Sequence, residues 1–424
     1  MEQGDLLKAH LVFVYENSPF YHDLWQSSWL PSGPPRLHDL PLVDSKAYWE
    51  ANRIEQNRLL TAPLAGAKVF KSGGTTGSPK FSYFSNADWK NFCTMFGEAL
   101  RLGGMRADER VANLFYGGQL YASLLFISRS MEESGLGVGF PISGSASTEE
   151  VIRTLQEFKI DTIAGVPTTM MSLLPELAKL DPSTLAIKRF IFGGENMYPD
   201  QIKSLQQVLP GCEVRSIGIA GVDYGEMGFV DDSCEAGVHR TLEQTTVLEL
   251  IDEAGLPIEE IGVEGKLYIT NFQRKLMPIV RYPVGDKAMW LDPPGEAGRR
   301  FKLLGRSEEA ARVGPMTLYL DDIHQIVHKV VGAHNPIAFQ LIIQHFDEKD
   351  QACLRIAVAE PSQLPSGLTD LLVETLIQQR KLYVDLLAKA VIHPYVIEWV
   401  RPDALITNPR TGKLLRVVDQ RFKA

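Results

Sequence analysis

The chain has 424 residues, of which 45% are hydrophobic and 22% charged. This is ordinary globular composition, and it excludes a disordered, collagenous or coiled-coil protein. With 43 basic and 52 acidic residues the formal charge is −9. Since the sequence has no basic cluster, we expect neither nucleic acid nor an anionic membrane as a partner.

The four cysteines are widely spaced and form no CxxC pair, which argues against a disulfide framework or a structural zinc site and suits a reducing cytosol. The first twenty residues lack the basic start and apolar stretch of a signal peptide. The most apolar window, 111–129, is interrupted by Asn113, Gly117, Gly118 and Gln119 and is too broken for a membrane-spanning helix. We therefore expect a soluble, cytoplasmic protein.

Apolar, β-branched runs alternate with amphipathic stretches over much of the first three hundred residues. Strands are predicted at 110–116, 161–167, 189–194, 213–220, 245–252 and 265–272. Helices are predicted at 147–158, 169–180 and 199–209. The first of these helices would be capped by Ser147 or Thr148. Alternating strands and helices are typical of a layered α/β fold with substantial parallel sheet.

The texture of the sequence changes to proline, glycine and charge at 292–310, as in a linker or hinge. Beyond it the pattern predicts a helix at 321–331, strands at 338–346 and 352–360, and one long helix at 369–392. The length of the chain also favours two domains. We place the boundary near 305/306, which gives a large domain at 1–305 and a small one at 306–424, each able to fold alone.

The strongest motif is KSGGTTGSPK at 71–80. Its glycines let backbone N–H groups turn inward as a nest for anionic oxygens, its hydroxyls add donors, and Lys80 adds a positive charge. It is not a Walker A loop, because the glycine-to-GK[ST] spacing is missing. Taken alone, it could equally be a flexible surface turn. The candidate phosphate-binding residues are Ser72, Gly73, Gly74, Thr75, Thr76, Gly77 and Lys80.

Four more motifs follow in order along the chain. They are GGENMYP at 193–199, RYPVGDKAMW at 281–290, LLGRSEE at 303–309 and NPRTGKLLR at 408–416. Together with the segment 71–80 they resemble the motifs of the adenylate-forming superfamily, which includes acyl- and aryl-coenzyme A ligases, luciferases and peptide-synthetase adenylation domains. The resemblance spans most of the chain, and the fixed order makes it much more specific than any single motif.

The resemblance implies a multi-layer α/β domain of β-sheets and packed helices at 1–305, which binds ATP and the acid, and a smaller mobile α+β lid at 306–424, which carries the catalytic Lys413. One ionised carboxylate, that of Asp286, would accept from both ribose hydroxyls. The compact ammonium of Lys413 would be suited to contact both the carboxylate oxygen and the α-phosphate. Ser307 stands at the hinge, where the family usually has Asp or Lys. The implied adenine and ribose contacts are Gly193, Gly194, Glu195, Asp286 and Arg306.

Each of these residues also has an ordinary structural explanation. Asp286 could be a turn residue, Arg306 a surface ion-pair partner and Glu195 a helix-capping acid. Lys413 could be one more solvated lysine. Their joint occurrence in the family's order favours the functional interpretation.

The family's magnesium motif, usually Y-G-x-[ST]-E, is altered in this chain. One register takes Glu226 as the acid, but two residues are then missing. The other sets 219–223 against the five positions and takes Asp223 as the acid. We prefer Asp223 because this register keeps the spacing. It replaces the aromatic residue by Ile219 and the hydroxyl by Val222, so stacking on adenine and one donor are lost.

Three further segments refine the resemblance. The segments 16–25 and 37–50 look like the start of phenylacetate–coenzyme A ligases. The segment 114–123 and the preferred magnesium register look more like acyl-protein synthetases and the adenylating proteins of phenazine-antibiotic biosynthesis. Some members of the branch carry a metal site in the region of Cys234 and His239. Two ligands are fewer than zinc needs, so a buried thiol and an ordinary histidine are the simpler interpretation.

The family's acid pocket lies beside an aromatic-rich segment that follows a strand. Here Gly117 and Gly118 remove side chains among the aromatics and could leave a flat slot for a ring. We therefore expect an aryl or heteroaryl acid, although simple core packing would explain most of these aromatics. The candidate lining residues are Phe115, Tyr116, Gly117, Tyr121, Ile219 and Ala220.

These observations predict an enzyme that activates a carboxylic acid with ATP as an acyl-adenylate and transfers it to coenzyme A, a carrier-protein thiol or an amine, in secondary metabolism such as antibiotic biosynthesis. ATP, Mg²⁺ and coenzyme A are the expected cofactors, and a small-molecule carboxylic acid and a carrier protein the expected partners. The alternative is a catalytically impaired relative that binds a nucleotide or aromatic acid as an accessory protein, which the altered magnesium motif favours. An unrelated phosphotransferase would need a Walker-type or kinase lysine that the sequence does not show.

Overall fold

The computed structural model describes residues 3–72, 80–194, 197, 199–306, 310–331, 338–358, 360–401, 404–406 and 415–421. The side chains of Thr168, Asp200, Arg306, Asp321 and Lys381 are outside this description. The described chain forms two compact units. The first holds the residues up to Leu304 apart from 199–203, and the second holds those from Gly305 onward together with 199–203.

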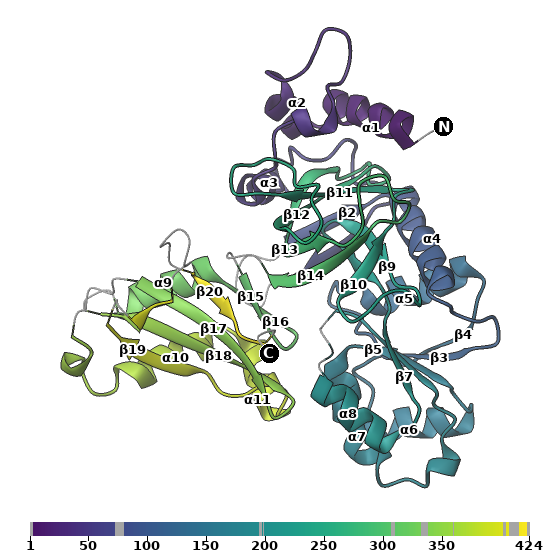
Figure 1. Ribbon diagram of the computed structural model, residues 1–424, viewed down its shortest axis with the longest axis vertical. Helices are drawn as coiled ribbons and strands as arrows, with labels where there is room; N and C mark the ends of the chain where they lie inside the picture. The colour runs from purple at the N-terminus through teal and green to yellow at the C-terminus, as the bar shows by residue number, and fades with distance from the viewer. Residues whose placement is uncertain are drawn as a thin grey trace. The chain divides into compact units, whose positions relative to one another are not determined.

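A five-stranded parallel sheet, in the order β4-β3-β5-β6-β7, lies in the first unit (Figure 1). Its strands are β3 (Arg110–Asn113), β4 (Val138–Pro141), β5 (Thr162–Gly165), β6 (Arg189–Phe192) and β7 (Glu213–Ser216). The helices that alternate with them along the chain are α4 (Asn86–Leu102), α5 (Ser123–Ser134), α6 (Thr148–Glu157), α7 (Pro167–Leu177) and α8 (Pro199–Val208). This arrangement confirms the expected α/β class.

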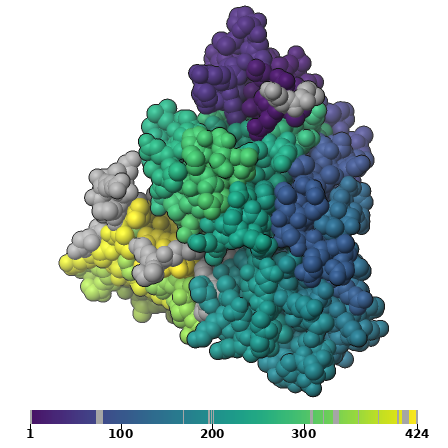
Figure 2. All heavy atoms as spheres, turned by 45° about the vertical axis from the view of Figure 1, so that its right-hand side comes forward, coloured from purple at the N-terminus to yellow at the C-terminus, as the bar shows by residue number. Residues whose placement is uncertain are grey.

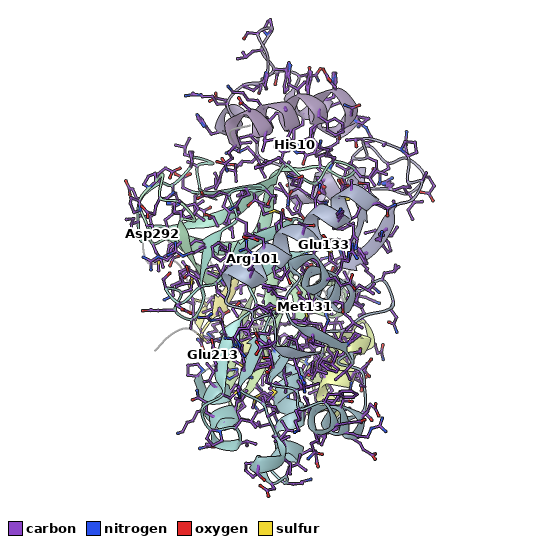
Figure 3. All side chains as sticks on the ribbon, turned by 90° about the vertical axis from the view of Figure 1, so that its right-hand side faces the viewer. His10, Arg101, Met131, Glu133, Glu213 and Asp292 are labelled. Atoms are coloured by element: carbon purple, nitrogen blue, oxygen red, sulfur yellow. The ribbon has the colours of Figure 1, made fainter. Side chains whose placement is uncertain are left out.

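Local side-chain contacts set the ends and the packing of these helices. The hydroxyl of Ser147 accepts a hydrogen bond from the backbone N–H of Glu150 at 3.2 Å, so Ser147, one of the two candidates, is the cap of α6. Helices α4 and α5 lie side by side (Figure 3), and Thr94 of α4 donates to Glu133 of α5 at 3.1 Å. Their apolar faces share one core with the parallel sheet.

A seven-stranded sheet, in the order β11-β12-β13-β14-β10-β9-β8, completes the first unit. Its strands are β8 (Ile219–Gly221), β9 (Gly225–Phe229), β10 (Val238–Thr241), β11 (Thr246–Ile251), β12 (Glu264–Asn271), β13 (Ile279–Trp290) and β14 (Arg300–Arg306). The expected single strand at 213–220 is wrong, because β7 and β8 belong to different sheets. Between them Gly218 has φ +107°, a conformation that glycine adopts readily.

The interpretation of 292–310 as a linker is also wrong in part. Seven of its residues form β14, which pairs with β10 in antiparallel fashion. Phe301 of this strand is fully buried and its ring lies against those of Trp290 and His239. The burial of this ring stabilises a strand within a segment whose composition is otherwise polar.

Three helices near the N-terminus pack on the seven-stranded sheet. Figure 2 shows this N-terminal segment, in purple, against green residues of the sheet region. The helices are α1 (Gln3–Asn17), α2 (Pro19–Trp25) and α3 (Ser45–Ala51), and a two-stranded sheet of β1 (Lys68–Ser72) and β2 (Lys80–Phe84) follows them. The phenol groups of Tyr21 and Tyr48 both donate to the carbonyl oxygen of Pro278, at 3.2 and 2.9 Å. These bonds attach the N-terminal segment to the chain between β12 and β13.

The second unit is an α+β structure, as expected. A hairpin of β15 (Ala310–Val313) and β16 (Met316–Tyr319) precedes a four-stranded mixed sheet in the order β19-β18-β17-β20. The sheet strands are β17 (Ala338–Phe346), β18 (Lys349–Ala357), β19 (Val396–Val400) and β20 (Val417–Asp419). The helices are α9 (Leu320–Val331), α10 (Leu368–Gln378) and α11 (Lys381–Ala388). Strand β17 has the bounds predicted from the sequence.

The single long helix expected at 369–392 is wrong, because the chain forms α10 and α11 with a break at Arg380. The break lets Leu372 and Leu376 of α10 and Tyr383 of α11 enter one core. Tertiary packing therefore overrides an apolar pattern that predicts one continuous helix.

The helices in the described part of the chain are short, and the longest, α4, has 17 residues. Within that part, no helix combines the length and the apolar character that crossing a bilayer requires.

Candidate active site

The carboxyl edge of the parallel sheet gathers several of the candidate residues. Backbone hydrogen bonds join the segments that leave its strands: Leu114 N–H donates to Ala164 at 2.7 Å and Ile217 N–H donates to Phe192 at 2.7 Å. In open α/β sheets, ligands bind outside this edge. The geometry therefore makes this edge the first place to look for a site.

Phe115 and Gly193 meet at this edge. Phe115 follows β3 and is buried, and Gly193 follows β6. A Cβ atom added to Gly193 would lie 2.7 Å from Cγ2 of Ile217 and 3.6 Å from the Phe115 ring. Side chains that follow two other strands thus press on this backbone, which leaves no room for a larger residue. The next residue, Gly194, is exposed, and Glu195 lies outside the described residues.

The aromatic candidates after β3 are partly open to solvent. Tyr116 is 40% exposed and Tyr121 37% exposed. The Tyr116 hydroxyl accepts a 3.3 Å hydrogen bond from Thr169 of α7. The space beside Gly117 is filled by Leu124, which would lie 2.9 Å from an added Cβ atom, whereas among the described residues nothing lies within 4 Å of a Cβ atom added to Gly118. Of the slot expected beside both glycines, the described residues therefore leave open the part at Gly118.

The start of the glycine- and threonine-rich segment contacts this aromatic loop. The backbone N–H of Lys71 donates to the carbonyl oxygen of Leu120 at 2.9 Å. The Lys71 ammonium also lies 5.0 Å from the centre of the Tyr121 ring, within cation–π range. Gly73–Gly77 lie outside the described residues.

The next residue, Ser72, contacts the acidic turn between β8 and β9. Its hydroxyl donates a short hydrogen bond to Oδ1 of Asp223, and the Ser82 hydroxyl donates to the same oxygen at 3.1 Å. Asp223 is half-buried, and among the described residues no hydrogen bond reaches its Oδ2. The structure thus brings together one candidate phosphate ligand and one candidate metal ligand.

Glu226, the other acidic candidate, has a different environment. It lies on β9 and is fully buried, and its Oε1 has no hydrogen-bond partner among the residues that the structure describes. Burial raises the pKa of Glu226 to about 7, although nearby Thr245, Asn271 and Arg274 favour the charged form. The carboxyl group of Glu226 is therefore enclosed within the sheet.

Arg274, which belongs to none of the sequence motifs, supports the acidic turn. Its guanidinium is buried, lies 3.9 Å from the centre of the Phe84 ring, and donates to the carbonyl oxygen of Val222 at 2.9 Å. Val222 directly precedes Asp223. Burial lowers the pKa of Arg274, against the opposing effect of the surrounding acidic groups. In the sequence Arg274 stands between Gln273 and Lys275, so nothing distinguishes it there from a solvated surface residue.

The donor set at the acidic turn fits magnesium. Mg²⁺ takes oxygen ligands and is usually held by one or two carboxylates together with substrate phosphates and water, rather than by an all-protein cage. Asp223 has one carboxylate oxygen without a hydrogen bond among the described residues. In the part of the chain that is described, no group of three or more His, Cys, Asp and Glu residues could hold a metal ion. That applies also to the surroundings of Cys234 and His239.

Asp286 lies at an irregularity in β13. Between the pairs Lys266↔Lys287 and Tyr268↔Pro283 the register shifts, so that Asp286 belongs to a bulge, and Gly285 has φ +85°. Bulges of this kind redirect side chains and are common beside active sites. Asp286 is half-buried and belongs to the long strand β13. It is therefore not a residue of a simple turn.

The other half-buried candidates lie on nearby strands. Ile219 and Ala220 lie on β8. Lys80 begins β2, with its ammonium 5.2 Å from the centre of the Trp49 ring. Arg306 ends β14, but its side chain is outside the description. Ser307 and Lys413 are outside it altogether.

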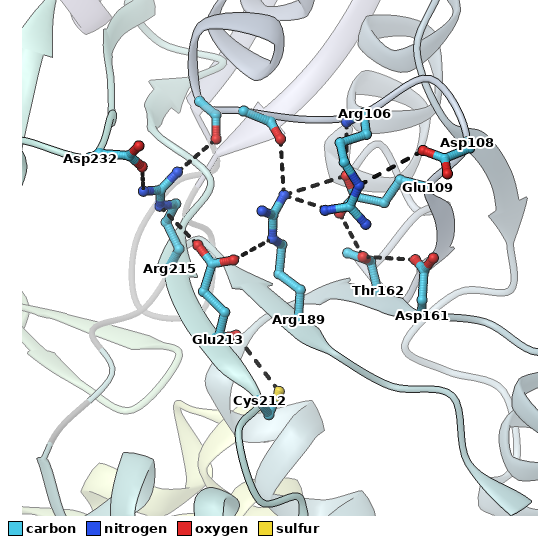
Figure 4. A network of polar contacts seen from close by, with 12 residues as sticks. Arg106, Asp108, Glu109, Asp161, Thr162, Arg189, Cys212, Glu213, Arg215 and Asp232 are labelled. Carbon is cyan, nitrogen blue, oxygen red and sulfur yellow. Dashed lines mark hydrogen bonds and ion pairs between the residues drawn. The ribbon is translucent and has the colours of Figure 1, made fainter.

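The opposite edge of the parallel sheet carries an ion-pair network (Figure 4). Glu109 is fully buried and accepts from Thr162 at 2.6 Å and from Arg189 at 3.2 Å, while Arg189 and Arg215 both contact Glu213. Thr162, Arg189 and Glu213 are the first residues of β5, β6 and β7. Because ligands bind at the other edge, this network is a structural tie between strand starts.

Comparisons with known proteins find relatives that match most of the chain. No family model matches it. Over 99% of its length the chain is 27% identical to the phenylacetate–coenzyme A ligase of Aromatoleum evansii, of which it covers 94%. The proteins of the same name from Thermus thermophilus and Escherichia coli are 26% and 22% identical, in each case over 85% of this chain and over 81% and 82% of theirs.

Solved structures share the fold. A 2-hydroxyisobutyryl-CoA ligase in complex with 2-HIB-AMP and CoA aligns with a TM-score of 0.72 and 17% identity, over 99% of this chain and 89% of that one. The amide bond synthetase McbA from Marinactinospora thermotolerans aligns with a TM-score of 0.51 and 15% identity, over 82% and 68%. At these identities the likeness establishes the architecture alone.

Proposed function

Because the chain belongs to the adenylate-forming superfamily, on the branch that includes the phenylacetate–coenzyme A ligases, we propose that it activates a small carboxylic acid with ATP and transfers the acyl group to coenzyme A. Likeness over nearly the full length to proteins of that name supports this proposal. The observation that carries it is the contact between Ser72 and Asp223, which sets the start of a phosphate-binding segment against an acidic turn.

The first step would be attack of the acid's carboxylate oxygen on the α-phosphorus of ATP. An acyl–phosphate bond forms, the bond to the β-phosphate oxygen breaks, and pyrophosphate leaves with the electron pair. Ser72 and the N–H groups of 73–77 would donate to the phosphate oxygens, and Asp223 would hold Mg²⁺, which neutralises phosphate charge. Lys413 would contact the carboxylate and the α-phosphate.

The nucleoside would be held by groups on other parts of the chain. Asp286, re-aimed by its bulge, would accept from both ribose hydroxyls, with Arg306 beside it. Gly193 and Gly194 would pass close to the adenine. In this proposal residues 1–305 bind ATP and the acid, and residues 306–424 form a lid that turns about Ser307 before the acceptor enters.

We propose an aryl or heteroaryl acid as the substrate. Exposed aromatic faces of Tyr116 and Tyr121, beside the open space at Gly118, support a flat ring as the ligand. Ile219 and Ala220 are half-buried and could complete the lining. Use of a carrier thiol or an amine as the acceptor, and a place in antibiotic biosynthesis, stay predictions from the sequence.

A second candidate is an accessory protein that binds a nucleotide or an aromatic acid without turnover. The loss of an aromatic ring at Ile219 and of a hydroxyl at Val222 favours it. Retention of Asp223, with a hydrogen bond from Ser72, supports the enzyme instead. Calorimetry with ATP, followed by a turnover assay, distinguishes the two.

The decisive assay is carboxylate-dependent exchange of labelled pyrophosphate into ATP, run with a panel of aromatic and aliphatic acids. We expect exchange with at least one aryl acid, formation of its coenzyme A thioester, and no exchange without an acid. Lys413→Ala should abolish exchange while binding of the acyl-adenylate persists. ATP binding without exchange for any acid would favour the accessory protein, and undiminished exchange in Lys413→Ala would overturn the lysine assignment.

A further inference from the structure

Gln340 is a buried amide in the middle of an apolar strand. It lies on β17 with no exposed surface, between Phe339 and Leu341, which are also buried. A primary amide in such surroundings is costly unless its polar atoms are hydrogen-bonded. A leucine or valine would fill the place without that requirement, so the partners of the amide indicate what it does.

All the partners of this amide belong to two places in the chain. Its Nε2 donates to the carbonyl oxygen of Ile406 at 2.9 Å and to that of Leu415 at 2.5 Å, and its Oε1 accepts from the N–H of Ile406 at 3.3 Å. The two carbonyl acceptors require the amide nitrogen to face them. Gln340 therefore joins residue 406 to residue 415.

The same two residues are also joined directly and packed together. The N–H of Leu415 donates to the carbonyl oxygen of Ile406 at 3.1 Å. Both side chains pack against Ile342 and Val418. The chain after Leu415 continues as β20, which pairs in parallel with β17 (Figure 1). We call Ile406, Leu415 and Gln340 the neck, because they close the two ends of 407–414.

We propose that Gln340 is a positioning residue for Lys413, a role that rests on the proposed function. Lys413 stands two residues before Leu415. Without the amide, two carbonyl oxygens and one N–H of the neck lose a partner in apolar surroundings, and water must enter or the ends must separate. Either change loosens the anchor at Leu415, two residues after Lys413. Gln340 itself does not contact the substrates.

Gln344 offers a matched control on the same strand. It is four residues from Gln340, so both side chains point to the same face of β17. Its Nε2 donates to Oε1 of Gln420 at 3.0 Å, beyond the end of β20 and away from the neck. Gln340→Met and Gln344→Met therefore remove the same chemical group from the same strand, but only the first opens the neck.

The first test measures pyrophosphate exchange in the full-length protein. We expect Gln340→Met to lower kcat about 10- to 100-fold, with the KM values for ATP and acid within about twofold of wild type, because a small misplacement of a catalytic group has this effect. Gln344→Met should stay near wild type. An equal loss in Gln344→Met, or no loss in Gln340→Met, overturns the proposal.

The second test does not depend on the reaction. Trypsin can cut 407–414 after Arg410 and after Lys413. We expect Gln340→Met to speed these two cuts about tenfold or more relative to wild type and to Gln344→Met, since cleavage follows the population of opened neck. Unchanged cleavage overturns the role of Gln340. If cleavage is faster but none of the acids tested supports pyrophosphate exchange, only the proposed function is refuted.

If Gln340→Met does not fold, a milder variant and a measurement on the wild-type protein still test the proposal. Gln340→Asn keeps the amide but is one methylene too short to reach both carbonyls, so it should give the same two effects in weaker form. In the wild-type protein, hydrogen exchange should show the Ile406 and Leu415 amides protected. Exchange of these amides at the rate of an unstructured chain would overturn the neck directly.

Discussion

The hydroxyl of Ser72 donates a hydrogen bond to the carboxylate of Asp223, although 151 positions separate the two residues. Ser82 donates to the same oxygen at 3.1 Å. Ser72 ends β1 and Asp223 stands in the turn between β8 and β9, so the bond joins two sheets. A group that would hold phosphate and a group that would hold magnesium are thereby neighbours before any ligand binds.

Replacing Asp223 by Asn should weaken the use of magnesium. The amide keeps the shape and can still accept from Ser72, but it lacks the negative charge that attracts a divalent cation. We expect the apparent affinity for Mg²⁺ to fall about 10- to 100-fold. Exchange rates measured over a range of Mg²⁺ concentrations at fixed ATP give this value.

Glu226→Gln is the matched control for that prediction. It makes the same change three residues away, in a side chain that is buried within the sheet. Its dependence on Mg²⁺ should be that of the wild type. A larger shift in Glu226→Gln than in Asp223→Asn would reverse the choice of register and make Glu226 the magnesium ligand.

The folding of the acidic turn should depend on Arg274. Arg274→Met keeps much of the stem but leaves the carbonyl oxygen of Val222 without its donor, and nearby Glu226 without a balancing charge. We expect the free energy of unfolding to fall by about 2–4 kcal/mol. Arg101→Ala, which removes an exposed pair with Glu98 on α4, should change it by less than about 1 kcal/mol. Urea unfolding of the three proteins measures the difference, and equal effects would contradict the prediction.

Much of the large unit could be predicted because its signals are local. Runs such as 161–167 and 189–194 are apolar, short and bounded by turn residues, and they became β5 and β6. The cap at Ser147 needs only the residues beside it. The family resemblance, which rested on motif order, is confirmed by relatives that match most of the chain.

What could not be predicted depends on distant contacts. A switch between sheets at Gly218, a strand inside the polar run 292–310 and a helix break at Arg380 all follow from which core a side chain reaches. No pattern in the sequence singles out Arg274, and its role becomes apparent only from its hydrogen bond to the carbonyl oxygen of Val222. The placement of Asp286 in a bulge likewise needs the neighbouring strand β12.

The buried carboxyl group of Glu226 should make stability fall as pH rises. Burial raises its pKa from 4.5 to about 7, so between these values the folded chain holds a proton that the unfolded chain has released. The folded state is then disfavoured progressively from about pH 4.5, and the loss is complete above about pH 7. From the size of the shift, this group costs about 3 kcal/mol across that range.

The measurement compares urea unfolding of wild type and Glu226→Gln at pH 5, 6, 7 and 8. The variant cannot ionise at this position, so its stability relative to wild type should increase by up to about 3 kcal/mol between pH 5 and 8. Parallel pH profiles for the two proteins would show that the carboxyl group is not held neutral by its surroundings.

The proposed preference for an aryl acid should depend on Tyr116. Its ring is 40% exposed at the carboxyl edge of the parallel sheet, and Thr169 fixes its hydroxyl. Tyr116→Ala removes the aromatic face but leaves the phosphate-binding residues unchanged, so kcat/KM for an aryl acid should fall about 10- to 200-fold while that for a short aliphatic acid changes little. Phe158→Ala provides the control, since Phe158 is 44% exposed but follows α6 as its C-cap and packs on Phe140. Equal losses for aryl and aliphatic acids in Tyr116→Ala would mean that this tyrosine supports the fold and does not select the substrate.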